Sequence, residues 1–153
     1  MELTHEHISE SNVIQVAELA LQLWPESTFR ELLDDFKAMI GDEQSFVFLV
    51  IIDNDPVGFA HISMRSDYVE GAEKLPVAYL EGIYVVPKQQ KKGIGQYMLT
   101  LAEDWATAQG CSQLASDVEI DNLNSQSFHQ KTGFQEVNRV VCYIKDLRKE
   151  KRL

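Results

Sequence analysis

Residues 77–110 read VAYLEGIYVVPKQQKKGIGQYMLTLAEDWATAQG, and this stretch decides the fold. Residues 77–86 are mostly apolar and predict a buried strand. A basic turn follows, and from about Gly93 to Gly110 apolar residues recur at helical spacing. Strand, glycine-containing loop and helix in this order can hold a phosphate, because unbonded N–H groups and the positive helix end face the anion.

The loop between this strand and helix has the composition of an anion site. Gly93 and Gly95 allow a close approach of the backbone, and Lys88, Lys91 and Lys92 supply positive charge. A G-x-G turn alone is weak evidence, and an ordinary turn at the start of a helix is the alternative. The spacing matches neither the dinucleotide fingerprint nor a Walker loop. A pyrophosphate ligand is therefore a hypothesis at this point.

The rest of the chain predicts a mixed α/β sheet. Helices are expected over residues 11–24, with Ser11 as the N-cap, and from a Thr28/Glu31 capping box to Gly41. Further expected elements are strands over 45–52, 57–64, 111–118 and 134–144 and a helix over 122–132. The long connection 65–76 is typical of a binding loop. We expect a single domain over residues 1–153, since no repeat or linker interrupts the pattern.

The charge distribution bears on the class of partner. The formal net charge is −10, which disfavours nucleic acid. Residues 1–80 hold 4 basic and 15 acidic side chains, whereas residues 81–153 hold 10 and 9. Such asymmetry suits one cationic and one anionic ligand, and a solvated acidic face is the alternative. No apolar run is long enough to cross a membrane, so we expect a cytoplasmic protein with no membrane partner.

Several cysteine, histidine and tryptophan residues are expected to be structural. Cys111 and Cys142 lie in apolar stretches and are predicted to be buried thiols. His5 and His7 have no third ligand at metal-binding spacing, so surface histidines and no metal site are expected. His61 is predicted to be a sheet residue with a satisfied ring, and Trp105 to lie in a helix core.

The motif V-V-P-x-x-Q-x-x-G-x-G at residues 85–95, followed by Asn122 and FHQKTGF at 128–134, resembles the GNAT acetyltransferase superfamily over nearly the whole chain. The resemblance implies the GNAT fold and acetyl-CoA as cosubstrate. By this resemblance the phosphate-binding residues are Gln90, Lys91, Lys92, Gly93, Gly95 and Gln96. The main chain of Ile83 and Val85 would pair with pantetheine.

Two further cofactor-binding positions follow from the resemblance. Asn122 matches an asparagine of the family. At position 129, where the family often has a tyrosine that serves as general acid, this chain has His129. An imidazole could donate that proton or only bind near the cofactor, so both roles stay open.

Shorter stretches are similar to bacterial aminoglycoside 6'-N-acetyltransferases. They are residues 23–25 (LWP), 65–71 (RSDYVEG), 76–77 (PV), 80–83 (LEGI) and 115–117 (ASD). This resemblance implies a cationic aminoglycoside acceptor, antibiotic resistance as the role, and a homodimer. It also implies that Trp24 and Tyr68 line the acceptor cleft and that Glu81 and Asp117 face the reacting amine.

Strand geometry supports the same two acids independently. Period-two alternation places Glu81 on the face of Ile83 and Val85, and Asp117 stands near the C-terminal end of a parallel-type strand. Two such carboxylates could attract a polycation and take a proton as the amine attacks the thioester directly. A backbone N–H near Ile83 would stabilise the oxyanion. The alternative is that both acids are ordinary strand-end residues.

Two other functions remain open from the sequence. The acceptor could be a polyamine or a peptide amine, with the same fold and chemistry. Because the family's tyrosine is absent at position 129, a CoA-binding sensor without turnover is also conceivable.

Overall fold

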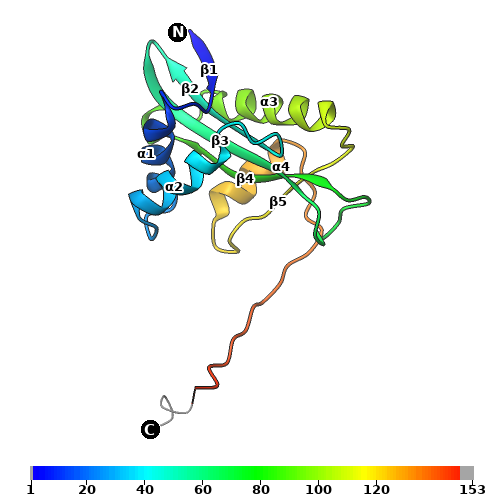
Figure 1. Ribbon diagram of the computed structural model, residues 1–153. Coiled ribbons are helices and arrows are strands. Elements are labelled where there is room, and N and C mark those ends of the chain that lie inside the picture. Colours follow the sequence, from blue (N-terminus) through cyan, green and yellow to red (C-terminus); the bar gives the residue numbers. More distant parts are fainter. Residues whose placement is uncertain (1, 149–153) are drawn as a thin grey trace. The chain divides into compact units, whose positions relative to one another are not determined.

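The computed structural model describes residues 2–148, and the chain divides into two compact units. The first unit ends at Asp117 and the second begins at Val118. All five strands belong to the first unit (Figure 1). Each unit is described below by itself, and the single domain over residues 1–153 stays a prediction.

The first unit is built on a five-stranded sheet whose strand order follows the chain, β1 to β5. Its strands are β1 (Leu3–His7), β2 (Ser45–Ile52), β3 (Asp55–Arg65), β4 (Val77–Val85) and β5 (Leu114–Ser116). The first four pair antiparallel, and β5 pairs parallel to β4. The predicted mixed α/β sheet is therefore confirmed. Asp53 and Asn54, both at positive φ, make the two-residue turn of the expected β2–β3 hairpin.

Helices cover both faces of this sheet. The helices of the first unit are α1 (Val13–Leu23), α2 (Phe29–Met39), the 3₁₀ turn η1 (Pro87–Gln89) and α3 (Ile94–Ala108). On one face Phe59 of β3 meets Phe36 of α2 edge to face, with ring centroids 5.9 Å apart. On the other face Phe46 of β2 stacks on Trp105 of α3 at 5.7 Å. Trp105 is thus half-buried against the sheet rather than fully within the core.

The two helix starts predicted from the sequence have different outcomes. Thr28 caps α2 as predicted, because its hydroxyl accepts a hydrogen bond from the Glu31 N–H at 3.1 Å. Ser11 does not cap α1. The N-cap is Asn12, which is 3% exposed and whose amide bonds back to the Ser9 N–H and the His7 carbonyl. The expected cap is wrong because this side chain ties the helix start to β1 instead.

Over residues 118–148, the described part of the second unit, the structure has one helix, α4 (Leu123–Lys131), and an extended C-terminal segment. The strand predicted over residues 134–144 is not formed, since no strand is assigned there. A strand needs a partner to satisfy its N–H and C=O groups, and within residues 2–148 this segment has none. Cys142 lies in it and is exposed, and Cys111 is only half-buried, so the prediction of two buried thiols is wrong.

Candidate active site

The site is built around a β-bulge at Glu81. His61 pairs with Gly82 and the next residue, Ile62, pairs with Leu80, so Glu81 is an extra residue on β4. A bulge re-aims side chains, because the local alternation of the strand is broken. Gly82 faces α1, where a Cβ would lie 2.6 Å from the Trp24 ring. Glu81 lies on this same side of the sheet, beside Trp24.

The bulge corrects the sequence-based placement of Glu81. Val85 lies opposite Gly58, where a Cβ would lie 3.5 Å from the Met98 sulfur of α3. The face of Ile83 and Val85 is therefore the α3 face, whereas Glu81 is on the α1 and α2 face. Period-two counting fails here because it assumes that every residue of β4 has one partner on β3.

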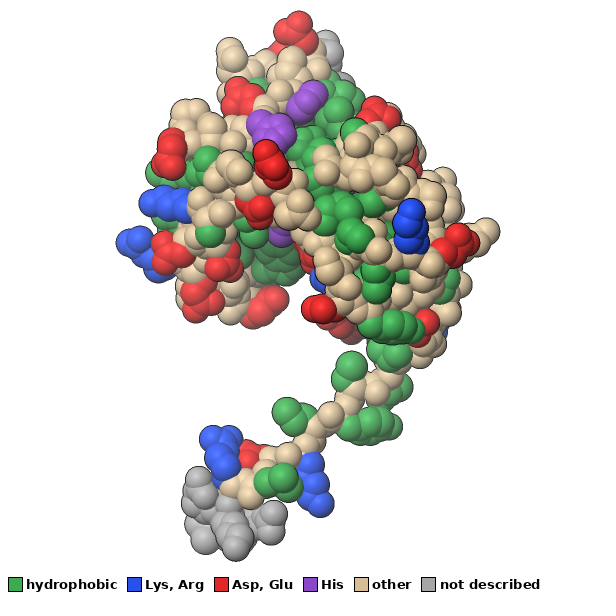
Figure 2. Space-filling view, turned by 45° about the vertical axis from the view of Figure 1, so that its right-hand side comes forward, with side chains coloured by type: hydrophobic (Ala, Val, Ile, Leu, Met, Phe, Trp, Pro, Cys, Tyr) green, Lys and Arg blue, Asp and Glu red, His purple; other side chains and the backbone are tan. Residues whose placement is uncertain are grey.

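A hollow of about 280 Å³ brings Glu81 and Trp24 together. It is lined by Trp24, Leu32, Asp35, Phe36, Met39, His61 and Glu81. This volume is just under the range typical of small-molecule sites, and the walls combine aromatic rings with two carboxylates. Acidic side chains outnumber basic ones on the folded face shown in Figure 2. The hollow thus suits a compact cation with an apolar ring face.

Glu81 is held by two side chains of β3. Arg65 donates to both of its oxygens, from Nε to Oε2 at 2.8 Å and from Nη2 to Oε1 at 2.6 Å. The Ser63 hydroxyl donates to Oε2 at 2.5 Å. Burial raises the pKa of Glu81, but the hydrogen bonds from Arg65 and Ser63 outweigh it and hold that pKa below its usual value. The carboxylate is therefore an anion at neutral pH.

Asp117 belongs to the same polar array. The buried Tyr79 hydroxyl donates a hydrogen bond to the Asp117 carboxylate, and the Arg65 guanidinium lies 3.5 Å above the centre of the Tyr79 ring. Burial, and then the hydrogen bond to Asp117, raises the pKa of Tyr79 to about 12, so the phenol keeps its proton. Arg65 thus contacts Glu81 directly. It also contacts the ring of Tyr79, which is the hydrogen-bond partner of Asp117.

Tyr68 is not brought into the hollow. Its side chain lies on the long connection between β3 and β4 and is 77% exposed. Its hydroxyl donates to Glu70 at 2.8 Å. Trp24 and Glu81 share the hollow, and Asp117 is linked to Glu81 through Arg65 and Tyr79. Tyr68 does not line the hollow, so its role in lining a cleft stays a prediction.

The expected phosphate loop leads into α3 with an unusual backbone. Lys91 has φ +63° and Gly93 has φ +86°, both in the left-handed region. For a lysine this conformation is strained, and strained residues cluster at ligand sites. Gly93 is the N-cap of α3, and a Cβ placed on it would meet nothing within 4 Å. The loop therefore presents lysines, free N–H groups and open space at one helix start.

The strand that leads to this loop has an open edge. In the described part of the chain, β5 pairs with β4 only at Ala78, Tyr79 and Leu80. Ile83 and Val85 lie beyond this paired stretch of β4, so β5 does not pair with their main chain. Gln90 ties the loop to this strand, because its Nε2 donates to the Val85 carbonyl at 2.8 Å. These residues fit an extended thioester arm that ends in a pyrophosphate. Gln96 is exposed on the first turn of α3, and Gly95 follows Ile94 in the same turn.

Asn122 and His129 lie in the second unit and have local partners there. Asn122 caps α4, since its Oδ1 accepts from the Ser125 N–H at 3.1 Å. His129 is buried, and its Nδ1 donates to the Ser125 carbonyl at 2.7 Å. The Phe134 ring lies 4.8 Å from it. Both residues have structural roles, and their cofactor contacts stay predictions.

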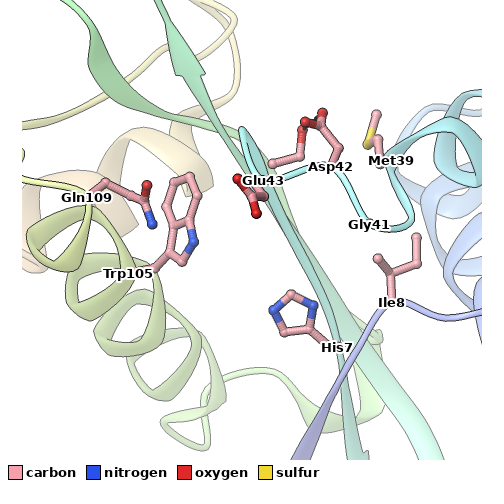
Figure 3. Close-up of a pocket in the computed structure, with 9 residues that line it drawn as sticks. His7, Ile8, Met39, Gly41, Asp42, Glu43, Trp105 and Gln109 are labelled. Carbon is pink, nitrogen blue, oxygen red and sulfur yellow. Dashed lines mark hydrogen bonds between the residues drawn. The ribbon is translucent and has the colours of Figure 1, made fainter.

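A second hollow, of about 400 Å³, contains no candidate site residue (Figure 3). It lies between His7, the turn at Asp42 and Glu43, and Trp105 and Gln109 of α3. His5 and His7 are exposed on β1, as expected, and the His5 ring meets the Tyr97 hydroxyl at 3.1 Å. Within residues 2–148 no three His, Cys, Asp or Glu side chains are grouped to hold a metal.

Sequence reasoning missed Asp35, His61 and Arg65 as site residues. His61 was expected only to be a sheet residue, yet its half-buried ring lines the hollow beside Glu81. Burial lowers its pKa although Glu81 opposes this, so the ring is neutral at neutral pH. Asp35 lies on the polar side of α2, where one acid among several gives no signal. The only signal for Arg65 was its place in a family-like stretch.

The comparisons with known proteins agree with this geometry. A family model described as the acetyltransferase (GNAT) family matches residues 13–134. An aminoglycoside N(6')-acetyltransferase type 1 of Stenotrophomonas maltophilia is 38% identical over 128 residues, which cover 83% of this chain and 82% of the relative. The enzyme of the same name from Serratia marcescens is 39% identical over 130 residues, covering 84% and 89%.

Solved structures extend the agreement to the whole fold. The structure of AAC(6')-Iy in complex with a bisubstrate analog, CoA-S-monomethyl-acetylneamine, matches with a TM-score of 0.90 at 32% identity, over 95% of this chain and 99% of that one. AAC(6')-Ih from Acinetobacter baumannii matches with a TM-score of 0.88 at 32% identity, over 96% and 100%. The chain therefore belongs to the GNAT acetyltransferase family, among the aminoglycoside 6'-N-acetyltransferases.

Proposed function

We propose that this protein is an acetyl-CoA-dependent N-acetyltransferase that acetylates the 6'-amine of aminoglycosides, with antibiotic resistance as its role. One observation carries the proposal. The anionic Glu81 lies in a hollow with the Trp24 ring, on the strand whose open edge runs to the glycine-containing loop. A cationic amine and a thioester can therefore meet along β4. The type 1 relatives carry this activity in their names.

In this proposal the loop holds the cosubstrate and the acidic residues act on the acceptor. The main-chain groups of the loop, with Lys91 and Lys92, hold the pyrophosphate, and acetyl-CoA supplies the activated acetyl group. Glu81 and Asp117 orient the acceptor amine and receive its proton, directly or through water, as the amine attacks the thioester carbonyl. The new C–N bond forms as the C–S bond breaks, and CoA leaves as a thiolate that takes up a proton from water. The N–H near Ile83 donates to the oxyanion that develops. No acyl group is passed to Cys111 or Cys142.

Thiol release from acetyl-CoA tests the function against its rivals. We expect release with kanamycin-type sugars that carry the 6'-amine and none with the same sugars that lack it. Faster release with spermidine or a short peptide would instead identify a polyamine or peptide acetyltransferase. Binding of acetyl-CoA without release on any amine would identify a CoA-binding sensor.

We further propose a cytoplasmic homodimer, supported by the C-terminal segment. Val140, Val141, Tyr143 and Ile144 are 70%, 73%, 92% and 100% exposed. Figure 2 shows hydrophobic side chains that stand out along the extended C-terminal segment. Such an apolar run is typical of a strand buried on both faces. A second copy offers the same segment, so reciprocal pairing would cover both at once. The two free thiols suit a reducing compartment.

Light scattering after gel filtration tests the dimer. We expect the native chain at twice its monomer mass of 17.4 kDa, and Val141→Asp at the monomer mass, because a charge cannot be buried between strands. Asn138→Asp adds the same charge to the same segment at a polar position and should remain dimeric. A native chain that is monomeric at micromolar concentration would reject the dimer.

A further inference from the structure

The role of Arg65 raises a problem of charge. A site for a polycationic acceptor should present net negative charge, yet Arg65 places a full positive charge against Glu81. The Arg65 side chain is 41% exposed, so solvent screens the pair and weakens its contribution to the stability of the fold. A positive charge in this position therefore calls for another explanation.

The hydrogen-bond geometry of Glu81 supplies one. A carboxylate accepts at about four lone-pair positions. Oε2 already accepts from Ser63 and from Arg65 Nε, and Oε1 accepts from Arg65 Nη2. By these contacts one acceptor position is left, on Oε1. Arg65 thus changes a freely rotating carboxylate into an acceptor with one fixed direction.

Arg65 also contacts Tyr79, and through Tyr79 it helps to fix the position of Asp117. The Arg65 Cζ lies 3.5 Å from the centre of the Tyr79 ring, and the Tyr79 hydroxyl donates to Asp117. Tyr79 is 7% exposed, so its ring is a fixed support between β4 and Asp117. A lysine could supply the charge but not the planar fork that donates to both oxygens of Glu81.

We propose that Arg65 is a positioning residue of the transfer reaction, which fixes Glu81 as an anion with one open acceptor position and, through Tyr79, keeps Asp117 in the same array. This deepens the proposed function, on which it rests. The array aims a defined oxygen at one N–H of the acceptor and leaves the attraction of further ammonium groups to Asp35. The array therefore selects an acceptor by the direction of one of its N–H bonds rather than by its total charge.

The test compares Arg65→Gln, Arg65→Lys and a control, Arg30→Gln. Arg30 loses the same charge from an exposed i,i+4 pair with Asp34 at 3.9 Å. For Arg65→Gln we expect kcat/KM for the sugar to fall at least tenfold, with acetyl-CoA affinity and melting temperature close to those of the control. Arg65→Lys should restore the pH profile in part but not kcat. Equal kinetics of Arg65→Gln and Arg30→Gln would overturn the proposal.

The pH profile separates positioning from a general structural effect. The titratable groups facing Glu81 are Arg65 and His61 on β3, Asp35 on α2 and Tyr79 on β4. Without Arg65, burial is opposed only by the weaker effects of Ser63 and His61, so Glu81 takes up its proton at higher pH. The acid limb of kcat/KM should therefore move upward in Arg65→Gln. A loss of activity with an unmoved limb would overturn the proposal.

A carboxyl NMR titration of Glu81, assigned with Glu81→Gln, reads the same shift without turnover. It distinguishes the two proposals, because a native chain that acetylates no amine would reject the function while this titration still reports on Arg65. Tyr79→Phe keeps the ring beneath Arg65 and removes the bond to Asp117. It should lower kcat without moving the Glu81 titration, and a moved titration would contradict the separate roles given to ring and hydroxyl.

Discussion

Replacement of Gly93 by valine is expected to weaken acetyl-CoA binding by roughly 100-fold, which is about 2.8 kcal/mol. Gly93 has φ +86°, a conformation that a β-branched residue avoids, so the loop would move its N–H groups to relieve the strain. No protein atom lies within 4 Å of a Cβ at this position, so a clash within the fold is not the cause. Calorimetry with acetyl-CoA measures the loss.

Gly110 provides a matched control for this substitution. It lies just beyond the other end of α3 and has φ +91°, and a Cβ placed on it would also meet no atom within 4 Å. Gly110→Val therefore carries the same backbone strain without the proposed ligand. We expect similar decreases in melting temperature for both variants and native acetyl-CoA affinity for Gly110→Val. If Gly93→Val also binds with native affinity, the phosphate loop is assigned wrongly.

The sequence predicts those features of the site that depend on local order along the chain. The loop from Gln90 to Gly95 could be located because strand, glycines, lysines and helix follow one another within a few residues. The Thr28 cap was found for the same reason, since its partner is the N–H three residues later. Loops and helix caps can be predicted from sequence because residues that are close in sequence are also close in space.

The features that sequence reasoning missed depend on how strands pair. The bulge at Glu81 exists only relative to β3, because His61 and Ile62 pair on either side of it. Arg65 and Glu81 are 16 residues apart, and Tyr79 and Asp117 are 38 apart, so no periodicity relates them. Alternation alone therefore put Glu81 on the wrong face, although it was identified as a candidate.

The missing strand over 134–144 has a similar cause. Its β-branched and aromatic residues are correctly read as strand-forming, but a strand is defined by its partner. Within residues 2–148 the segment has no pairing partner, and Val141 and Tyr143 stay exposed. Composition therefore shows that a segment can form a strand, but a strand forms only where a partner strand is present.

Replacement of Asp117 by asparagine is expected to lower kcat about 100-fold while acetyl-CoA affinity stays within about twofold of native. The amide oxygen can still accept the hydrogen bond from Tyr79, so the array keeps its shape and only the negative charge is lost. If the carboxylate receives the proton of the amine, that loss acts on the transition state more than on the bound ground state. Rapid-mixing kinetics of thiol release with a saturating 6'-amino sugar measure the effect on the transfer step.

Asp104→Asn is the charge-matched control, because Asp104 is exposed on α3, which packs on the opposite face of the sheet from Glu81. It should leave kcat unchanged. A decrease that is equal in both variants would mean that the net charge of the protein, rather than Asp117, governs the rate through attraction of the cation. Native kcat in Asp117→Asn would remove this carboxylate from proton transfer and leave the array around Glu81 as the acceptor of the proton.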